Sequence, residues 1–572
     1  MDILLVASAF NSLSQRVYAE LSDLGHRVDV VLATQGTEPV RAAVRELRPD
    51  LVVAPMLKSA LPEDVWRDHT CLIVHPGPPG DRGPSALDWA ITEQAPNWGV
   101  TVLQAEAAMD AGDVWASEPF PVPPVGKSDL YRNEASDAAV AAVLLAVRRY
   151  ADGSYKPRSQ ADDPATAPHI VWRGFLRQER RRIDWENDGT EAVLRKLRGA
   201  DSQPGVLDEL LGREVFLHGG HPEDRLRGRP GELLATRYGA VCRATRDGAV
   251  WIPELRPRRN SGDPAPFRRP AASVLASFPD APRLPEDTVP LEPPPDRRTW
   301  SDIRYRRRGD AGFLSFSFPG GAMSTEQCRR LLTAYRYALA RPTPVLVLGS
   351  DRDFFSNGIH LNVIEAAADP AEESWINLNA MDDLVEAVLR TTDRLVVTAL
   401  PGNAAAGGAM LALAADEVWC RTGTVLNPHY RRMGLYGSEF WTYTLPRRVG
   451  DGLAHRLTGE ALPLSAASAG RIGLVDRMVP AAPGEFGAQV ERLAADLAAA
   501  PDLARRIADK HTARRLDEAR RPLAEYRRDE LDRMHAVFFD PGAPYHALRS
   551  AFVRKKPAGS VQPLAAVTGD LG

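Results

Sequence analysis

The sequence predicts a multidomain α/β protein. The chain has 572 residues, which is more than a single hydrophobic core usually serves. Short apolar segments alternate with amphipathic segments near the N-terminus, and the same alternation begins again near residue 301. Between these two stretches lie short apolar runs separated by glycine turns. This order predicts two α/β units with a smaller β unit between them.

The first unit, residues 1–160, is expected to be Rossmann-like. The expected strands are 3–10, 27–33, 50–57 and 71–77, and the expected helices are 11–25, 38–49 and 85–94. Short apolar strands between amphipathic helices predict a parallel sheet covered by helices. Ligands of such sheets bind at the carboxyl ends of the strands, where His75 is found. No G-x-G-x-x-G follows the first strand, so dinucleotide binding is not favoured.

The rest of the chain divides by composition. Residues 161–258 read as short strands with glycine turns, which predicts a small OB-like β domain. Residues 259–300 are rich in proline, arginine and aspartate and are expected to form a linker. A second α/β unit is expected over 301–483, followed by a helical region over 484–572.

Composition excludes several classes of protein. The net charge of -4 argues against a nucleic-acid binder. The four cysteines, Cys71, Cys242, Cys328 and Cys420, have no paired spacing, which indicates a reducing compartment rather than a disulfide framework or zinc site. The N-terminus lacks the basic region of a signal peptide, and no apolar run is long enough to cross a bilayer. We therefore expect a cytoplasmic protein with no membrane partner.

A histidine and a carboxylate are the first candidate catalytic pair. His75 ends an expected strand, and Asp110 lies in a turn 35 positions later. A carboxylate can orient an imidazole and stabilise its charged form during proton transfer. Any α/β protein can carry a loop histidine and a turn aspartate, so the residues alone leave a purely structural role equally open.

The segments IVHPGPPGDRGPSALDWAI and GVTV…MDAGDV resemble the formyltransferases that use 10-formyl-tetrahydrofolate. The resemblance covers about the first 260 residues and implies catalytic roles for His75 and Asp110. The asparagine that this family has two positions before the histidine is Ile73 here, so another group must stabilise the oxyanion. Candidates for binding the folate or its formyl group are Asn11, Ser12, Ser14, Gln15 and Arg82. Capping of the first helix by Asn11 or Ser12, and bracing of the Asp81 loop by Arg82, remain open alternatives.

Three motifs in the second half resemble the crotonase, or enoyl-CoA hydratase/isomerase, family. They are DRDFFSNGIHLNVIE, LPGNAAAGGAMLALAADEVWC and TGEALPLSAASAGRIGLVDRMVP. The family binds acyl-CoA and polarises its thioester carbonyl with two backbone N–H groups, which the resemblance assigns to Asn357 and Gly407. The CoA contacts that family position suggests are Arg352, Phe355, Ser356 and Ile359. The structural alternative is that the glycines only permit tight packing.

The chemistry of this second site departs from hydration. The two hydratase glutamates align with Met410 and His429, and methionine cannot transfer a proton. The nearby segment offers Tyr430, Tyr436 and Glu439 as acid and base instead. The alternative is that Tyr436 and Glu439 pack and cap a helix start.

The two halves together resemble the hydrogenase maturation factors of the HypX/HoxX type. The resemblance implies that the chain makes carbon monoxide for nickel-iron hydrogenase. The simplest shared intermediate is formyl-CoA, made from 10-formyl-tetrahydrofolate and coenzyme A and then split into carbon monoxide and CoA. Hydrogenase maturation proteins are the partners that this resemblance implies.

Two other functions remain open at this point. A formyltransferase acting on a tRNA-linked or amino-sugar amine would use basic residues such as Arg177 and the run 180–182. A non-enzymatic carrier of CoA or a one-carbon unit would only dock on a hydrogenase assembly complex. A metal site at His218 and His221 is not favoured, because no third ligand is evident.

Overall fold

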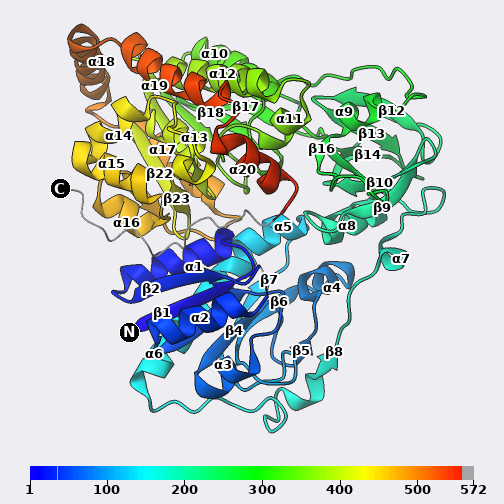
Figure 1. The fold of residues 1–572 in the computed structure, drawn as a ribbon. Coiled ribbons are helices and arrows are strands. Elements are labelled where there is room, and N and C mark those ends of the chain that lie inside the picture. Colours follow the sequence, from blue (N-terminus) through cyan, green and yellow to red (C-terminus); the bar gives the residue numbers. More distant parts are fainter. Residues whose placement is uncertain (35, 557–572) are drawn as a thin grey trace.

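The computed structural model describes residues 1–34 and 36–556. Two α/β units and a smaller β unit lie against one another, with the first α/β unit at the bottom of Figure 1. The last part of the expected helical region, from residue 557, lies outside the described residues. Within the described ranges, no helix is long and apolar enough to cross a membrane.

The first unit has a six-stranded sheet in the order β2-β1-β3-β4-β6-β7. Its strands are β1 (Asp2–Ala7), β2 (Arg27–Leu32), β3 (Leu51–Met56), β4 (Cys71–His75), β6 (Asn97–Gln104) and β7 (Val114–Pro121). Strands β1 to β4 are parallel as expected. Strands β6 and β7 extend this sheet as an antiparallel hairpin around the turn that contains Asp110, and β6 also pairs antiparallel with β4.

Helices cover this sheet, and some of them contact the second unit. They are α1 (Ser12–Asp23), α2 (Glu38–Leu47), α3 (Glu63–Asp68), α4 (Ala86–Thr92), α5 (Lys127–Leu130) and α6 (Ser136–Asp152). Helix α6 buries a face of alanines and valines, and their small size allows the helix to approach β6 and β7 closely. A π-helical turn, η1 (Tyr131–Ala135), joins α5 to α6.

The small β unit contains two four-stranded sheets, in the orders β16-β15-β10-β9 and β11-β14-β13-β12. The strands are β9 (Val206–Leu210), β10 (Arg213–His218), β11 (His221–Glu223), β12 (Leu233–Arg237), β13 (Ala240–Ala244), β14 (Ala249–Ile252), β15 (Glu254–Pro257) and β16 (Arg269–Pro270). Strand β16 and helix α9 (Ala271–Ala276) fall inside the predicted linker. The linker prediction is therefore wrong for these residues, because Val274 and Leu275 are buried in the core of the β unit.

The second α/β unit has a six-stranded sheet in the order β17-β18-β19-β20-β22-β25. The strands are β17 (Ile303–Arg308), β18 (Ala311–Phe316), β19 (Val345–Gly349), β20 (Leu395–Leu400), β22 (Glu417–Arg421) and β25 (Arg477–Val479). All neighbouring pairs are parallel except β17 with β18. The helices that matter for the site are α12 (Pro370–Arg390), α13 (Gly407–Leu413), α14 (Trp441–Val449) and the 3-10 turn η4 (Tyr430–Met433).

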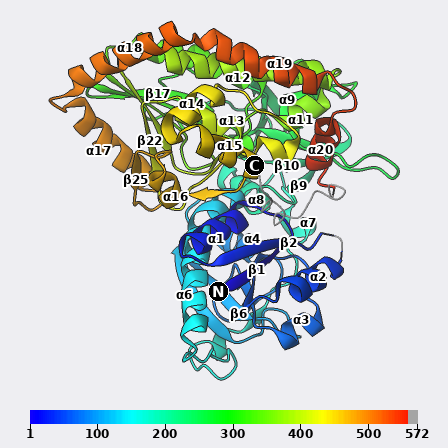
Figure 2. The ribbon, with the colours of Figure 1, turned by 60° about the vertical axis from the view of Figure 1, so that its left-hand side comes forward.

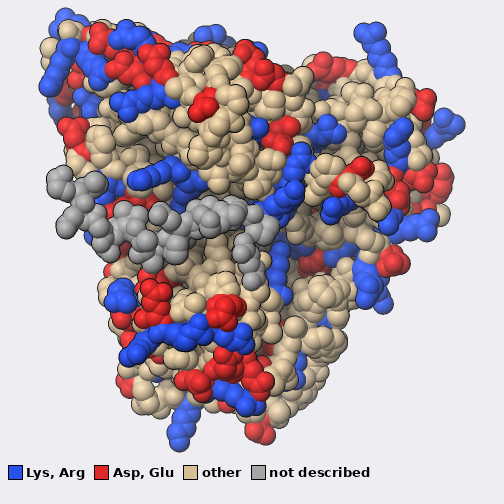
Figure 3. Space-filling view, in the orientation of Figure 1, with Lys and Arg blue, Asp and Glu red and all other residues tan. Residues whose placement is uncertain are grey.

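Four helices lie among the described residues of the region predicted to be helical. They are α17 (Phe486–Ala498), α18 (Leu503–Arg520), α19 (Leu523–Phe538) and α20 (Pro544–Val553). Figure 2 shows α18 and α19 running across the outer side of the second unit. Met534 and Phe538 of α19 are buried against Leu378 of α12, so this region belongs to the second unit's fold. On the face shown in Figure 3, Lys and Arg are interspersed with Asp and Glu.

Candidate functional site

His75 lies at the carboxyl end of β4 between two carboxylates. Its side chain is 4% exposed, and its Nε2 lies 2.9 Å from Asp81 Oδ2. Its Nδ1 lies 3.5 Å from Asp110 Oδ1. Arg173 donates from Nη1 to the other oxygen of Asp81 at 2.7 Å. The imidazole is therefore held by a shorter contact to Asp81 than to Asp110, the residue that the sequence singled out.

The glycine that follows His75 is explained by this arrangement. A Cβ on Gly77 would lie 2.3 Å from Asp81 Oδ2 and 2.4 Å from His75 Nε2. Only glycine therefore leaves room for the histidine and the aspartate to meet. The tight His-Pro-Gly turn reverses the chain, so that Asp81, six positions after His75, returns to the imidazole. The sequence separation of the two residues did not by itself predict this contact.

Asp110 is positioned by its backbone as well as its side chain. It has a left-handed φ of 55°, which is uncommon for a residue with a side chain. Its Oδ2 accepts a hydrogen bond of 3.0 Å from the Gly83 N–H. The buried Gln160 donates from Nε2 to Asp110 O and to Gly112 O, and its Oε1 accepts from the Gly80 N–H. Gln160, which no motif in the sequence singled out, thus joins the loops that carry Asp81 and Asp110.

The residues at the start of α1 form local contacts. Asn11 caps the helix, since its Oδ1 accepts from Ser14 N–H at 3.0 Å, and its Nδ2 donates to the Tyr131 hydroxyl at 2.9 Å. Gln15 donates from Nε2 to Phe10 O, and Ser14 donates to Ala9 O. These contacts support the capping interpretation. They join the helix start to η1, and no hydrogen bond of the described chain joins it to His75.

Ile73, which replaces the family asparagine, and Arg82, a candidate for binding the folate, lie in different surroundings. Ile73 is in β4 and packs partly buried against an apolar cluster, so it supplies no polar group to the His75 region. Arg82 is partly buried in β5 (Asp81–Arg82), which pairs with β8 (Val171–Trp172). Its Nε is buried and has no hydrogen-bond partner within the described chain, which leaves this donor available to a ligand.

The second candidate site is built around Glu439, on the loop that leads into α14. Tyr430 donates from its hydroxyl to Glu439 Oε2 at 2.7 Å, and the Ser438 N–H donates to the same oxygen at 3.2 Å. The other oxygen, Oε1, lies beside Gly407, where a Cβ would come within 2.2 Å of it. Glu439 therefore points Oε2 toward Tyr430, and points Oε1, which has no hydrogen-bond partner among the described residues, toward the start of α13.

Burial shifts both members of this pair toward their neutral forms. It raises the pKa of Glu439 to about 8, with a further contribution from the nearby carboxylate of Asp382. Burial also raises the pKa of Tyr430 well above its usual value, and the charge of Glu439 adds to this effect. Tyr430 is thus the hydrogen-bond donor, and Glu439 is a carboxyl group that can gain or lose a proton near neutral pH.

Tyr436 lies outside this hydrogen-bonded pair. Its ring packs against Trp441 with a centroid separation of 5.3 Å, and the Arg533 guanidinium lies over it at 4.4 Å. Of the three residues predicted to be acid or base, the structure therefore brings together Tyr430 and Glu439. Met410 is fully buried in α13, in keeping with its inability to replace a hydratase glutamate.

The two backbone donors predicted for the oxyanion have different environments. The Asn357 N–H donates to Gly321 O at 2.7 Å, so it is not available to a ligand and its assignment is corrected. The Gly407 N–H forms no hydrogen bond among the described residues, and a Cβ on Gly358 would lie 3.2 Å from that nitrogen. The next N–H along the chain, that of Ile359, is likewise without a partner in the described chain.

Three of the predicted CoA contacts have partners inside the protein. Phe355 is buried against Phe316, with a centroid separation of 5.3 Å. Ser356 is buried and accepts from the Gly358 N–H. Arg352 pairs with Asp129 and Glu134. These residues therefore shape the fold around the site, and Ile359, which is partly exposed, is the remaining candidate of the four.

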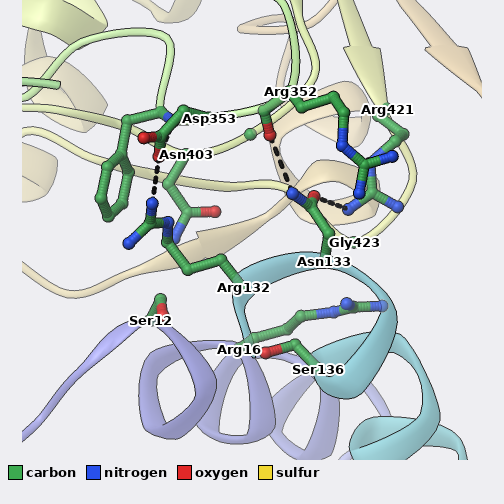
Figure 4. Close-up of a pocket in the computed structure, with 12 residues that line it drawn as sticks. Ser12, Arg16, Arg132, Asn133, Ser136, Arg352, Asp353, Asn403, Arg421 and Gly423 are labelled. Carbon is green, nitrogen blue, oxygen red and sulfur yellow. Dashed lines mark hydrogen bonds and ion pairs between the residues drawn. The ribbon is translucent and has the colours of Figure 1, made fainter. Parts of the chain in front are cut away.

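Ion pairs join the first unit to the second. Arg352 Nη2 lies 3.1 Å from Asp129 Oδ1 and 2.7 Å from Glu134 Oε1, and Arg132 Nη2 lies 2.6 Å from Asp353 Oδ1. Asn133 on η1 donates to Arg352 O at 2.8 Å. Figure 4 shows Arg132 and Asn133 of the first unit meeting Asp353 and Arg352 of the second.

A cavity of about 20 Å³ lies among these contacts. Ser12 and Arg16 of α1 line it from one side, and Asn403 and Arg421 line it from the other. A space of this size holds about one water molecule, so it does not by itself hold a formyl thioester.

The histidines considered for a metal site are separate. His218 is buried, and neither ring nitrogen has a partner in the described chain. His221 stacks on Trp300 instead. Among the described residues there is no group of three or more His, Cys, Asp or Glu side chains placed to hold a metal ion.

Comparison with known proteins agrees with this two-part architecture. Residues 176–264 match the C-terminal domain of formyl transferases, and residues 322–540 match the enoyl-CoA hydratase/isomerase family. A methionyl-tRNA formyltransferase of Bacillus licheniformis is 28% identical over 37% of this chain and 66% of its own length. These matches confirm the predicted combination of a formyltransferase-like half and a crotonase-like half.

Two relatives cover nearly the whole chain. The hydrogenase maturation factor HoxX of Bradyrhizobium diazoefficiens is 48% identical over 97% of this chain and 95% of its own. The crystal structure of HypX from Aquifex aeolicus in complex with tetrahydrofolic acid superposes with a TM-score of 0.93 at 42% identity, and covers 100% of this chain and 99% of that one. The chain therefore belongs to the HypX/HoxX family of hydrogenase maturation factors.

Proposed function

We propose that this protein makes carbon monoxide from 10-formyl-tetrahydrofolate in two steps, with coenzyme A as the second substrate, for the maturation of nickel-iron hydrogenase. The proposal rests above all on the Tyr430–Glu439 pair beside Gly407 in a crotonase-like unit that has Met410 where hydratases have a glutamate. This unit keeps an acyl-CoA type of site and has an acid-base group suited to a reaction without water.

The first step is formyl transfer near His75. The CoA thiol attacks the formyl carbon, and His75 takes the thiol proton as general base. Asp81 and Asp110 stabilise the imidazolium that forms, because their carboxylates face its two nitrogens. The carbon–nitrogen bond to the folate then breaks, His75 gives its proton to the folate nitrogen, and the products are formyl-CoA and tetrahydrofolate.

The second step is decarbonylation near Glu439. The ionised Oε1 of Glu439 removes the formyl proton while the carbon–sulfur bond breaks, and the departing sulfur then takes this proton from the carboxyl group. The thioester becomes carbon monoxide and free CoA, so atoms and protons balance. Tyr430 donates a hydrogen bond to Oε2 throughout, and the N–H groups of Gly407 and Ile359 are the donors available to the thioester oxygen.

The test uses purified protein with 10-formyl-tetrahydrofolate and CoA, and traps gas with deoxyhaemoglobin. We expect the His75→Ala variant to stop folate consumption, and the Glu439→Gln variant to stop gas release while folate consumption continues. Folate consumption that needs an amine and not CoA would instead support an amine formyltransferase. The absence of both folate turnover and carbon monoxide from wild-type protein would support a carrier.

A labelling experiment asks how the thioester travels between the units. Protein receives 13C-formyl folate and CoA together with an excess of unlabelled formyl-CoA. Carbon monoxide that keeps the label shows transfer within the protein, whereas dilution of the label shows passage through solution. This result separates the relay from the chemistry of the two steps.

A further inference from the structure

Three carboxyl groups from distant parts of the chain meet in the interior of the crotonase-like unit. Asp382 comes from α12, Glu439 from the loop before α14, and Glu530 from α19. Asp382 and Glu530 are 0% exposed and Glu439 is 1% exposed. Buried carboxyl groups are costly unless they are hydrogen-bonded or protonated, so their close grouping requires a reason.

The outer two carboxylates fix the backbone that carries Glu439. The Glu439 N–H donates to Asp382 Oδ1 at 2.8 Å, and the N–H groups of Phe440 and Thr442 donate to Glu530 at 2.9 and 2.8 Å. Ser438 donates its hydroxyl to Asp382. Glu439 and Phe440 both have left-handed φ values, 60° and 58°, a conformation that non-glycine residues adopt only at an energetic cost. The hydrogen bonds to Asp382 and Glu530 hold the loop in this conformation.

The charges around Glu439 are mostly negative. The titratable or charged groups that face Glu439 or its two carboxyl neighbours come from four elements. They are Cys328 of α10 (Thr325–Leu339), Asp382 and Asp383 of α12, Tyr430 of η4, and Arg527 and Glu530 of α19. Arg527 is the cation of this set; it pairs with Asp383 and Glu386 at the edge of the cluster.

The protonation of the cluster follows from burial and like charge. Burial, followed by the charge of Asp382, raises the pKa of Glu439 and of Glu530 to about 8. Burial raises the pKa of Asp382 to about 7, and the charge of Arg527 opposes this rise. Three adjacent buried carboxyl groups cannot all ionise together, so they share protons.

We propose that Asp382 and Glu530 are positioning residues that fix Glu439 beside Gly407 and, through their negative charge, favour its protonated form, so that Glu439 can hold a proton and return it during catalysis. This inference rests on the proposed decarbonylation at Glu439. It adds two residues that touch no reacting atom and act only through Glu439.

The first test is the pH profile of carbon monoxide release from supplied formyl-CoA in the Asp382→Asn variant. Asparagine keeps the oxygen that accepts from Glu439 N–H and removes the negative charge. The pKa of Glu439 should therefore fall, and the rising limb of the profile should move to lower pH by about one unit or more. Glu530→Gln should move it the same way. A lower rate at every pH with an unmoved profile would show that the two residues are only structural.

Asp529→Asn is the matched control, because Asp529 neighbours Glu530 on α19 but is half exposed and pairs with Arg521. It should leave the profile in place.

An infrared titration of protonated carboxyl groups, without substrate, separates this inference from the proposed function. The absorption that Glu439→Gln removes should titrate at lower pH in Asp382→Asn than in wild type. If wild-type protein releases no carbon monoxide but this titration shifts, the proposed function fails and the proton-sharing cluster stands. If carbon monoxide is released but the titration does not shift, the cluster inference is wrong and the function stands.

Discussion

Replacing Tyr430 with phenylalanine removes one hydroxyl from the second site and leaves the ring in its buried position. In the wild type this hydroxyl donates to Glu439 Oε2 at 2.7 Å. A hydrogen bond to a charged group contributes about 1.5–3 kcal/mol, and each 1.36 kcal/mol is a factor of ten in rate. Tyr430→Phe should therefore slow carbon monoxide release by about 10- to 150-fold. Folate consumption at His75 should be unchanged.

The same substitution should also move the pH profile. The hydrogen bond from Tyr430 stabilises the ionised form of Glu439 and lowers its pKa. Without it the pKa of Glu439 rises, so a smaller fraction of the enzyme has an ionised base at neutral pH. The rising limb of the profile for carbon monoxide release should move to higher pH, measured with deoxyhaemoglobin as the gas trap across a series of buffers.

Tyr436→Phe is the matched control for this prediction. Tyr436 lies six positions later, and its ring packs against Trp441 and beneath Arg533. The Tyr436→Phe substitution removes one hydroxyl, and it should change neither the rate of carbon monoxide release nor its pH profile. Equal activity of Tyr430→Phe and the wild type, or a greater loss in Tyr436→Phe than in Tyr430→Phe, would refute the assignment of Tyr430 as the partner of Glu439.

Three further predictions concern both sites and the stability of the fold. His75→Ala should abolish consumption of 10-formyl-tetrahydrofolate but still release carbon monoxide from supplied formyl-CoA; loss of both activities would contradict separate sites. Gly407→Ala should reduce gas release at least about 100-fold, because the Cβ would displace Glu439 Oε1. Circular dichroism should show that this variant keeps a native fold. Near wild-type gas release would exclude this placement of Glu439. Folding raises the pKa of Glu530 to about 8, so protonated Glu530 stabilises the folded state. This contribution is fully present below the ordinary carboxyl pKa and is lost as the pH rises through about 8. The melting temperature should therefore fall over this range, and it should fall less in Glu530→Gln; an equal fall in both proteins would contradict the pKa of Glu530.

The sequence predicted the fold class, because the fold class depends on local patterns. Alternation of apolar strands and amphipathic helices indicates an α/β unit wherever it occurs. The same patterns did not predict the antiparallel hairpin of β6 and β7, since apolar strands look alike in either direction. Helix α9 was missed because the proline-rich composition around it outweighed a short apolar segment that includes Val274 and Leu275.

Site residues were harder to predict where contacts depend on tertiary structure. Asp382 and Glu530 stand 57 and 91 positions from Glu439 in the chain, and no spacing rule joins three separate segments. Asp81 was close to His75 in sequence, but its approach depends on the turn at Gly77. The backbone donor assigned to Asn357 was wrong because motif position does not reveal which N–H a neighbouring carbonyl, here that of Gly321, already occupies.

One short loop of the crotonase-like unit serves two neighbours at once. Arg352 and Asp353 at its start bind carboxylate and guanidinium groups of the first α/β unit, and Gly358 at its end lies against the Gly407 nitrogen. Only seven residues therefore separate the anchors on the first unit from the backbone beside the Gly407 N–H, the proposed thioester donor. Separating the two halves by cutting the gene would leave this loop without its anchors, so the isolated crotonase-like half is expected to be a poorer catalyst than the intact chain.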